Sequence, residues 1–456
     1  MLFSSIPFLY YFLPCVLILY YIVPNRLKNL ALLLVSLVFY AWGEPNYVFL
    51  MIAMILLCYP AGRLIQTYEG CKKGRAVLWG TTGICLGTLA FFKFFDVAWP
   101  IGISFYTFQL ISYLVDVSRG TPAQKSLVNL GAYVTMFPQL IAGPIVRYGD
   151  IQRQLKERVC SYEKTLDGIF RFLIGLGKKI LISNALGELC EIFQSSDDQA
   201  VLYFWLYAVS YTLQIYFDFS GYSDMAIGLG KLFGFEFMEN FNYPYISKSI
   251  TEFWRRWHIS LGSWFRDYVY IPLGGNRVSR PRWYLNLLIV WFLTGLWHGA
   301  AWNFIVWGLM FAVLLVLEKQ WKLTFGTKTE QKKESVVQSV LKHGYVLFFV
   351  ILSFVIFHAS DLEEEVFYLR SMFGAEGFPL VSQECIYYLK SYGVLLTAAM
   401  IGATPLPKRL AEKAVHTKVG NYGWRVLRPV AAILLLGICT AYLVDSSFNP
   451  FLYFRF

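Results

Sequence analysis

The chain carries a succession of long apolar segments that begins near its first residue and recurs almost to its last. A helix needs about 20 mostly apolar residues to cross a bilayer, and segments such as 3–24, 47–66 and 299–318 meet that need. In lipid every backbone polar group must be satisfied inside the segment, so these runs fold as helices. The sequence therefore predicts an all-α, polytopic integral membrane protein.

Composition supports this prediction. Only 15% of the residues are charged and 57% are hydrophobic, whereas an average soluble domain has about 25% charged residues. This excludes an ordinary soluble enzyme, a disordered chain and a fibre. Several apolar segments are short or broken, so we expect roughly 10–13 transmembrane helices together with re-entrant or interfacial helices. We expect a single transmembrane domain over 1–456, with N-terminal helices in 1–100, a catalytic core in 101–320 and C-terminal helices in 321–456.

The basic residues predict which side each loop occupies. The formal net charge is +11, which is typical of basic cytoplasmic loops facing anionic membrane lipid, and we expect no nucleic-acid partner. Loops 248–282 and 319–342 are basic and predicted to be cytoplasmic. The acidic segment 359–366 is predicted to lie outside, as is the N-terminus. We expect a multi-pass membrane protein.

Residues 283–319 lie between two of these basic loops, so the segment must enter the membrane and return. Its two arms of 15 to 20 residues reach about 22–30 Å at 1.5 Å per residue. The centre of the segment is Gly295-Leu296-Trp297-His298-Gly299. We therefore predict a helical hairpin with His298 near its bend and with glycines that allow close packing.

His298 is the most unusual of the five histidines. An ionisable side chain at membrane depth is costly and suggests function, and a neutral imidazole suits a general base. The alternative is a structural histidine bonded to a neighbouring helix. His258 lies in a segment, 251–272, whose mixture of Trp, Arg and apolar residues predicts a helix at the cytoplasmic face. It could be functional or structural. The remaining three are expected to be structural: His343, His358 and His416.

Other charged residues are candidates for supporting roles. Asp218 and Asp224 could orient a histidine, bind a cation or cap a helix broken at Ser220-Gly221, and a structural role is also open. A basic cluster in one loop could receive the phosphates of an anionic donor, or could simply bind anionic lipid. The cluster consists of Lys248, Arg255, Arg256, Arg266 and Arg277.

Motifs for other chemistries are absent. The sequence has no P-loop, dinucleotide fingerprint, GxSxG or HExxH. The eight cysteines form no CxxC pair, so we expect lone thiols and no metal site. No bound cofactor is expected.

Motifs spread over nearly the whole chain resemble the membrane-bound O-acyltransferase (MBOAT) family. They include MFPQLIAGPIVRYGDI at 136–151, NYPYISKSITEFWRRWHISLGSWFRDYVYIPLGGNR at 242–277 and TGLWHGAAWNFIVWG at 294–308. The likeness is to the bacterial branch that O-acetylates alginate, other exopolysaccharides or peptidoglycan.

The resemblance implies a multi-helix membrane fold around a central tunnel. It implies that His298, in the Trp-His-Gly motif, is catalytic and that His258, in Arg-Trp-His-Ile-Ser-Leu, is the second signature histidine. It also implies an acetyl group, acetyl-CoA as co-substrate, and a periplasmic or extracellular partner protein that passes the acetyl group on. The location that it implies is the bacterial inner (cytoplasmic) membrane. Donors to the oxyanion are expected near His298, with Trp297, Trp302 and Asn303 as candidates.

Two other functions stay open. One is D-alanyl transfer to teichoic acid from an acyl-carrier protein, within the same superfamily. The other, from a different class, is a polysaccharide transporter or export scaffold without chemistry, which would tolerate replacement of His298.

Overall fold

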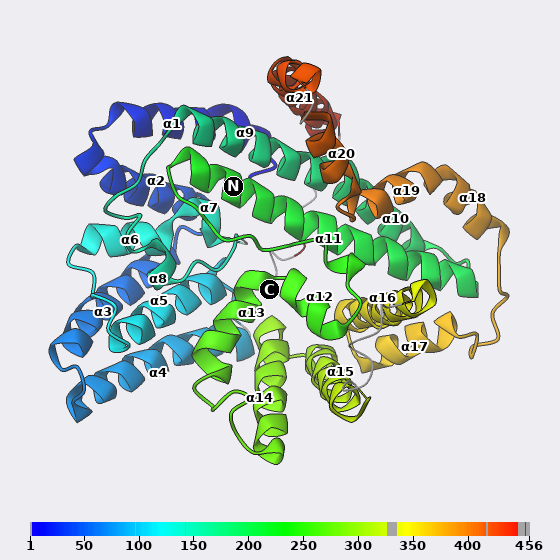
Figure 1. Cartoon of the computed structure of the whole chain (residues 1–456), viewed down its shortest axis with the longest axis horizontal. Coiled ribbons are helices and arrows are strands. Elements are labelled where there is room, and N and C mark those ends of the chain that lie inside the picture. The colour runs from blue at the N-terminus through cyan, green and yellow to red at the C-terminus, as the bar shows by residue number, and fades with distance from the viewer. Residues whose placement is uncertain are drawn as a thin grey trace. The chain divides into compact units, whose positions relative to one another are not determined.

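The structure is a computed structural model that describes residues 2–95, 97–141, 143–325, 335–415, 418–445 and 452. Every regular element within these ranges is a helix (Figure 1), which confirms the all-α prediction. His416 lies outside the described residues.

The chain groups into two compact units, each assembled from separate stretches of sequence. The first contains Met1–Leu176, Gly221–Glu239 and Thr440–Arg455. The second contains Gly177–Ser220, Asn240–Cys439 and Phe456. Both candidate histidines and the whole predicted hairpin belong to the second unit.

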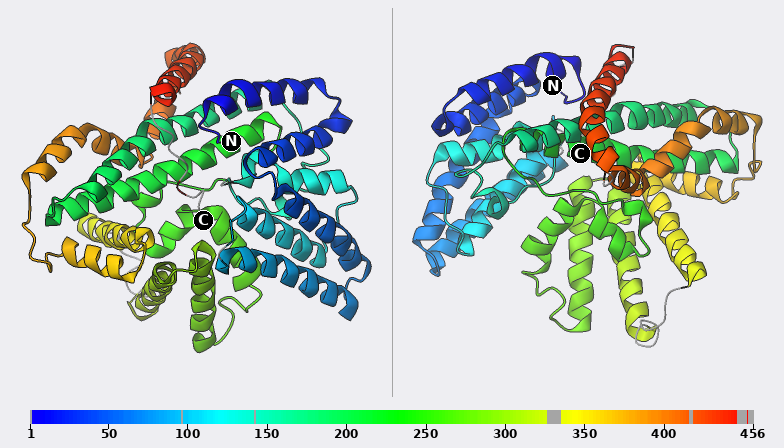
Figure 2. Two further views of the ribbon diagram at one scale, coloured as in Figure 1. Left: turned by 180° about the vertical axis from the view of Figure 1, so that it is seen from behind. Right: turned by 45° about the horizontal axis from the view of Figure 1, so that its top comes forward.

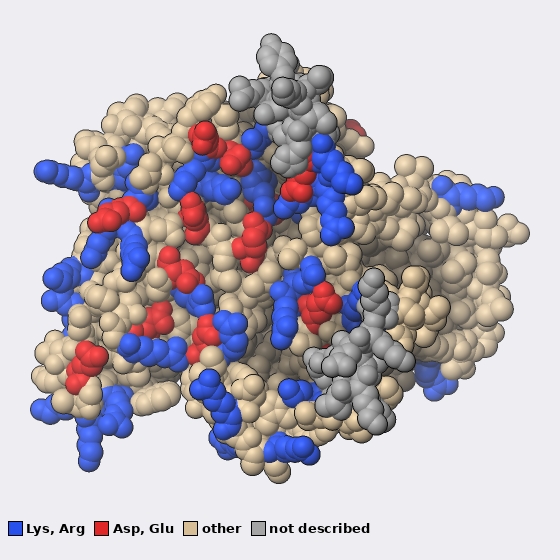
Figure 3. All heavy atoms as spheres, in the orientation of Figure 1, with Lys and Arg blue, Asp and Glu red and all other residues tan. Residues whose placement is uncertain are grey.

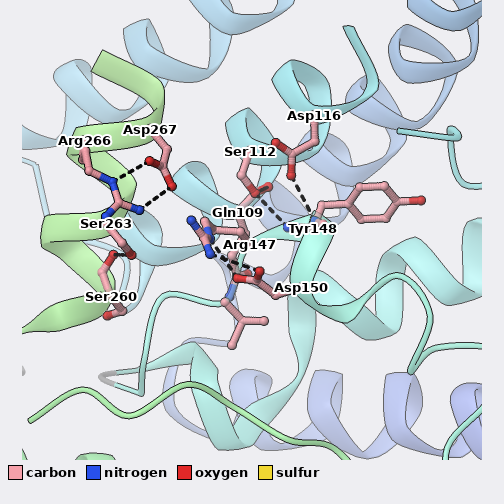
Figure 4. A network of polar contacts seen from close by, with 12 residues as sticks. Gln109, Ser112, Asp116, Arg147, Tyr148, Asp150, Ser260, Ser263, Arg266 and Asp267 are labelled. Atoms are coloured by element: carbon pink, nitrogen blue, oxygen red, sulfur yellow. Dashed lines mark hydrogen bonds and ion pairs between the residues drawn. The ribbon is translucent and has the colours of Figure 1, made fainter. Parts of the chain in front are cut away.

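The first unit is a layered set of helices in which α3, α4 and α5 pack against one another (Figure 2). Its elements are η1 (Phe8–Phe12), α1 (Leu13–Ile22), η2 (Asn25–Leu27), α2 (Lys28–Gly43), α3 (Val48–Thr67), α4 (Lys72–Phe94), α5 (Ile103–Ser118), α6 (Leu127–Thr135), α7 (Phe137–Leu140), α8 (Tyr148–Ile151) and α9 (Tyr162–Gly177). Polar contacts join α5 to α8: the backbone N–H of Tyr148 donates to Ser112 Oγ at 3.2 Å (Figure 4).

The second unit holds the remaining helices. They are η3 (Lys178–Ser183), α10 (Asn184–Ser195), η4 (Pro244–Ile246), α12 (Ile250–Arg256), α13 (Ile259–Phe265), η5 (Arg266–Tyr270), α14 (Arg280–His298), α15 (Trp302–Phe325), α16 (Val336–His358), α17 (Leu362–Met372), α18 (Gln383–Ser391), α19 (Gly393–Gly402) and α20 (Leu406–Val415). Two further helices, α11 (Val201–Leu232) and α21 (Lys418–Asp445), contribute residues to both units.

The predicted break at Ser220-Gly221 is wrong, because α11 runs unbroken through this point for 32 residues. Gly221 serves close helix packing instead. A Cβ on Gly175 of α9 would lie 2.4 Å from the carbonyl oxygen of Gly221, and one on Gly228 would lie 2.6 Å from that of Gly168. Glycines therefore let the backbones of α9 and α11 touch, as small residues do between membrane helices.

Six of the described helices are long and apolar enough to cross a membrane, and the bent pair α18–α19 would make a seventh. Other segments expected to span are shorter or interrupted. Residues 127–146, for example, form the nine-residue α6 and the four-residue α7. Residues 130–141 are buried within the protein, which is where irregular segments at membrane depth are tolerated.

Candidate active site

The predicted hairpin is present. α14 ends at His298, α15 begins at Trp302, and the two helices lie side by side (Figures 1 and 2). Glycines set their spacing: a Cβ on Gly295 would lie 2.4 Å from the carbonyl oxygen of Phe304, and one on Gly308 would lie 2.4 Å from that of Trp291. His298 is thus the last helical residue before the bend, held by backbones in direct contact.

Aromatic rings enclose His298, which is only 4% exposed. The centroid of its imidazole lies 5.0 Å from the rings of both Trp307 and Phe357, at interplanar angles of 82° and 84°. Phe304 lies 6.4 Å away and is nearly parallel to it. These contacts fix the plane of the imidazole before any ligand binds.

His258 occupies a break between two short helices. It separates α12 from α13 with φ 43° and ψ 54°, so the predicted helix over 251–272 is interrupted at this residue. A non-glycine residue in the left-handed region costs on the order of 1–3 kcal/mol, and such strain is concentrated at functional sites. The side chain is buried, with 2% exposure.

Asn240 determines the tautomer of His258. Its Oδ1 lies 3.1 Å from His258 Nδ1 and accepts from both the backbone N–H and the hydroxyl of Ser260, at 3.2 and 2.8 Å. A backbone N–H can only donate, so the amide atom that faces it must be the oxygen. The Nδ1 of His258 must therefore carry the proton.

The other nitrogen of His258 is left as an acceptor. Its Nε2 is buried and has no hydrogen-bond partner within the described residues. Burial lowers the pKa of His258 to about 3, because a desolvated site disfavours the charged imidazolium. His258 is thus a neutral imidazole whose Nε2 lone pair can accept a hydrogen bond but holds a proton poorly.

Trp297 joins the two histidines. Its ring centroid lies 4.8 Å from that of His298 and 6.3 Å from that of His258. Both imidazoles therefore lie against one buried indole, although 40 positions separate them in the sequence. The structure brings together the two residues that the motifs singled out.

Asn303, a candidate oxyanion donor, is engaged elsewhere. Its Nδ2 donates to the carbonyl oxygens of Ile356, Phe357 and Ala359 at 3.4, 3.3 and 2.7 Å. It caps the C-terminal end of α16, whose last carbonyls lack helical partners. Asn303 thereby fixes Phe357, which forms one wall around His298. Trp302, another candidate donor, is 67% exposed.

The two candidate carboxylates on α11 belong to different units. Asp218 forms a buried ion pair with Lys179 at 2.7 Å and accepts from Ser183 Oγ at 3.3 Å. Asp224 pairs with Arg171 at 2.6 Å. Each carboxylate has a cationic partner on a neighbouring helical segment, as buried charges require, and this arrangement favours the structural role.

The basic cluster is heterogeneous. Arg256 donates to Glu252 at 2.9 Å and to the carbonyl of Asn242 at 3.0 Å. Arg266 forms a two-point ion pair with Asp267 (Figure 4). Lys248, Arg255 and Arg277 have exposed side chains, and neither Arg255 nor Arg277 forms an ion pair with any described residue. Figure 3 shows acidic side chains interspersed with basic ones over the face that it displays.

Sequence reasoning missed Asn240, Ser260 and the aromatic wall of Trp307 and Phe357. Asn240 lies 18 residues before His258, so no local spacing connects them. The one available signal is a polar residue two positions before the turn-forming sequence Asn242-Tyr243-Pro244-Tyr245.

Comparison with known proteins gives matches that include the segments of both histidines. Residues 122–358 match the membrane-bound O-acyltransferase family. The chain is 38% identical to the probable alginate O-acetylase of Azotobacter vinelandii, over 100% of both chains. It is 32% identical to the peptidoglycan O-acetyltransferase of Helicobacter pylori, covering 100% of this chain and 98% of that protein. It is 30% identical to the teichoic acid D-alanyltransferase of Bacillus subtilis, over 57% of this chain and 69% of that protein.

Proposed function

Because this chain is a member of the membrane-bound O-acyltransferase family and an O-acyltransferase, we propose that it moves an acetyl group from cytoplasmic acetyl-CoA across the membrane. The acetyl group serves O-acetylation of an extracytoplasmic polysaccharide or cell-wall polymer. The relatives named as alginate and peptidoglycan O-acetylating enzymes match over the full length of the chain, which supports acetyl as the group transferred.

The observation that carries the proposal is the pair of imidazoles against Trp297 at the bend of a glycine-packed hairpin. His298 acts as the general base. It takes the proton of an acceptor hydroxyl, whose oxygen attacks the thioester carbonyl. The C–S bond breaks, and the imidazolium returns its proton to the leaving thiolate to give free CoA. A positioned base contributes roughly 10²- to 10⁴-fold in rate.

His258 has a different task in this mechanism. Its low pKa makes it a poor proton carrier at neutral pH, whereas its fixed Nδ1–H tautomer leaves Nε2 as an acceptor. His258 Nε2 therefore accepts a hydrogen bond from a substrate and so orients it next to the indole that His258 shares with His298. The substrate group is either the hydroxyl that receives the acetyl group or an amide N–H of acetyl-CoA. Orientation of this kind lowers the entropic part of the barrier.

The donor approaches from the loop that holds the basic cluster. Exposed Arg255 and Arg277 are free of ion pairs among the described residues, and they are the side chains available for the phosphates of CoA. Arg256 and Arg266 keep their acidic partners and shape the loop. Guanidinium groups bind phosphate through paired hydrogen bonds.

Sidedness is part of the proposal. Loops 248–282 and 319–342 face the cytoplasm, the segment 359–366 and the N-terminus face outward, and the protein resides in the bacterial inner membrane. A periplasmic or extracellular partner protein passes the acetyl group to the final acceptor. Cysteine labelling of intact cells with an impermeant reagent tests the sides: Asp361→Cys should label without permeabilisation, and Arg280→Cys only after it. The reverse pattern would overturn the proposed topology.

Acetyl transfer in membrane vesicles tests the function. Vesicles from cells that produce the chain receive acetyl-labelled acetyl-CoA, and both labelled polymer and released CoA thiol are measured per amount of inserted protein. His298→Ala should lower both by about 100-fold or more. The matched control is His343→Gln. Among the described residues His343 bonds only the carbonyl of Ser247, at 3.2 Å, so this variant should keep full activity. Near-normal transfer by His298→Ala would remove the base from the mechanism.

D-alanyl transfer from a carrier protein is the second candidate, favoured by the match to the teichoic acid D-alanyltransferase. It predicts that the purified chain ignores acetyl-CoA and consumes a D-alanylated carrier. An export scaffold predicts polymer export that depends on the chain but not on His298. The same vesicles, supplied with each donor, separate these functions.

A further inference from the structure

A cavity of about 130 Å³ lies in the second unit, where the end of α10, the segment 196–199, the start of α11 and one face of α17 meet. Six aromatic side chains line it: Phe193, Tyr203, Phe204, Tyr207, Phe367 and Tyr368. Several of these rings brace one another, such as Phe193 against Tyr203 at 4.6 Å and Phe204 against Tyr368 at 5.4 Å. The walls are therefore preformed and rigid.

Four polar side chains complete the lining: Gln194, Ser196, Asp198 and Gln199. Two of them, Ser196 and Asp198, are bonded to residues outside the cavity. Ser196 Oγ donates to Glu384 at 2.9 Å, and Asp198 accepts from the hydroxyl of Ser382. Gln194 Nε2 donates to the hydroxyl of Tyr207 at 3.4 Å. The lining thus offers carboxylate, amide and hydroxyl groups, and it contains no lysine or arginine.

We infer that this cavity binds one neutral sugar unit of a polysaccharide. Aromatic faces suit the C–H surfaces of a sugar ring, while a carboxylate and amides suit its hydroxyls. Small-ligand sites combine apolar walls with a few fixed polar groups in this way. A uronate would bring its carboxylate to a cavity that already holds Asp198 and, behind Ser196, Glu384. Like charges disfavour that ligand.

The cavity connects structurally to the candidate active site. The hydroxyl of Tyr207 lies 2.8 Å from His358 Nδ1, and the preceding residue, Phe357, forms the wall 5.0 Å from His298. Consecutive residues at the end of α16 thus hold the cavity on one side and the imidazole on the other. The sugar site rests on the proposed function only in that its ligand is the polymer that receives the acetyl group through the partner protein, and sugar binding itself needs no acyl donor.

Binding to the purified full-length chain in lipid nanodiscs, without any thioester, tests the inference. Saturation-transfer NMR compares cellotetraose, a neutral hexose oligosaccharide, with an oligomannuronate of the same length. Cellotetraose should bind saturably and more tightly than the uronate. Phe367→Ala and Gln199→Ala should each weaken it about fivefold, which equals about 1 kcal/mol. Asp198→Asn should narrow the difference in affinity between cellotetraose and the oligomannuronate, because it removes the negative charge and keeps a hydrogen-bond acceptor for Ser382.

The matched control is Phe373→Ala. Phe373 is 59% exposed and packs against Trp205 outside the cavity, so its loss should leave cellotetraose binding unchanged. Thermal unfolding of each variant confirms folding. The inference is overturned if cellotetraose does not bind saturably, if Phe367→Ala and Gln199→Ala bind it like wild type, or if the uronate binds as tightly. Cellotetraose binding without acetyl transfer in the vesicles would reject the acetyl-transfer proposal alone. Acetyl transfer without cellotetraose binding would reject the sugar site alone.

Discussion

Replacing Asn240 with alanine removes the one oxygen that accepts from His258 Nδ1–H, the Ser260 N–H and the Ser260 hydroxyl. The hydroxyl can rotate to another acceptor, but the two N–H groups are fixed and buried. Each buried donor that loses its partner costs about 1–3 kcal/mol. Partial relaxation reduces the sum, so we expect Asn240→Ala to lower the free energy of unfolding by roughly 2–4 kcal/mol.

The same substitution should release the tautomer of His258. The bond to Asn240 stabilises the Nδ1–H form by about 1–1.5 kcal/mol. Without this hydrogen bond, the fraction of molecules in which His258 has its proton on Nδ1 and a free lone pair on Nε2 falls by up to about tenfold. Acetyl transfer per folded molecule should fall accordingly, beyond any loss of protein. Asn240→Asp keeps the acceptor, so it should retain the Nδ1–H form, and its negative charge should raise the pKa of His258 above about 3.

Two measurements check this reasoning. Histidine-selective ¹⁵N NMR reads the tautomer directly, and only five histidines contribute signals. Transfer in vesicles gives the rate per inserted molecule for wild type, Asn240→Ala and Asn240→Asp. A wild-type spectrum with the proton of His258 on Nε2, or an alanine variant with unchanged tautomer and rate, would refute the role of Asn240.

Three further predictions concern the hairpin, the donor and the pH. Gly308→Ala places a Cβ 2.4 Å from the carbonyl oxygen of Trp291, so it should lower the free energy of unfolding by about 1–3 kcal/mol and reduce activity. Gly80→Ala is the control, because its Cβ meets nothing within 4 Å and should leave stability unchanged. Equal unfolding midpoints for the two variants would contradict the close packing of the hairpin. The double variant Arg255→Gln/Arg277→Gln should raise the acetyl-CoA concentration needed for half-maximal rate by about tenfold with the maximal rate unchanged, because ground-state contacts bind substrate and transition state alike. Arg280→Gln/Arg282→Gln is the control. Saturation curves of Arg255→Gln/Arg277→Gln that superimpose on those of wild type would exclude phosphate binding by Arg255 and Arg277. The pKa of His258 is near 3 in the folded chain and 6.5 in the unfolded chain. Between these pH values the unfolded state binds the extra proton, so the free energy of unfolding falls as the pH drops from about 6.5 toward 3. His258→Gln should flatten this pH dependence in thermal unfolding, and an unaltered pH profile would show that His258 is not the titrating group.

The hairpin and its histidine follow from the order of the amino acids. Charge at both flanks and the length between them required residues 283–319 to turn back, and Gly295 and Gly308 allow the backbones of α14 and α15 to touch. The apolar segments likewise determined the helical class. These features are predictable because hydrophobic length, basic flanks and glycine each act within one short stretch of chain.

The contacts around the histidines are decided by tertiary structure. Asn240 reaches His258 because the break after α12 turns the chain back toward it, and Asn303 reaches the end of α16 because α15 packs beside that helix. Asp218 and Asp224 are six residues apart on one helix, yet each pairs with a different cation in a different unit. The sequence alone determined which side chains could carry chemistry and where the chain had to turn. Only the packing of distant helices decided which atoms meet, because a hydrogen bond depends on ångström-scale positions that hydrophobic pattern and charge do not specify.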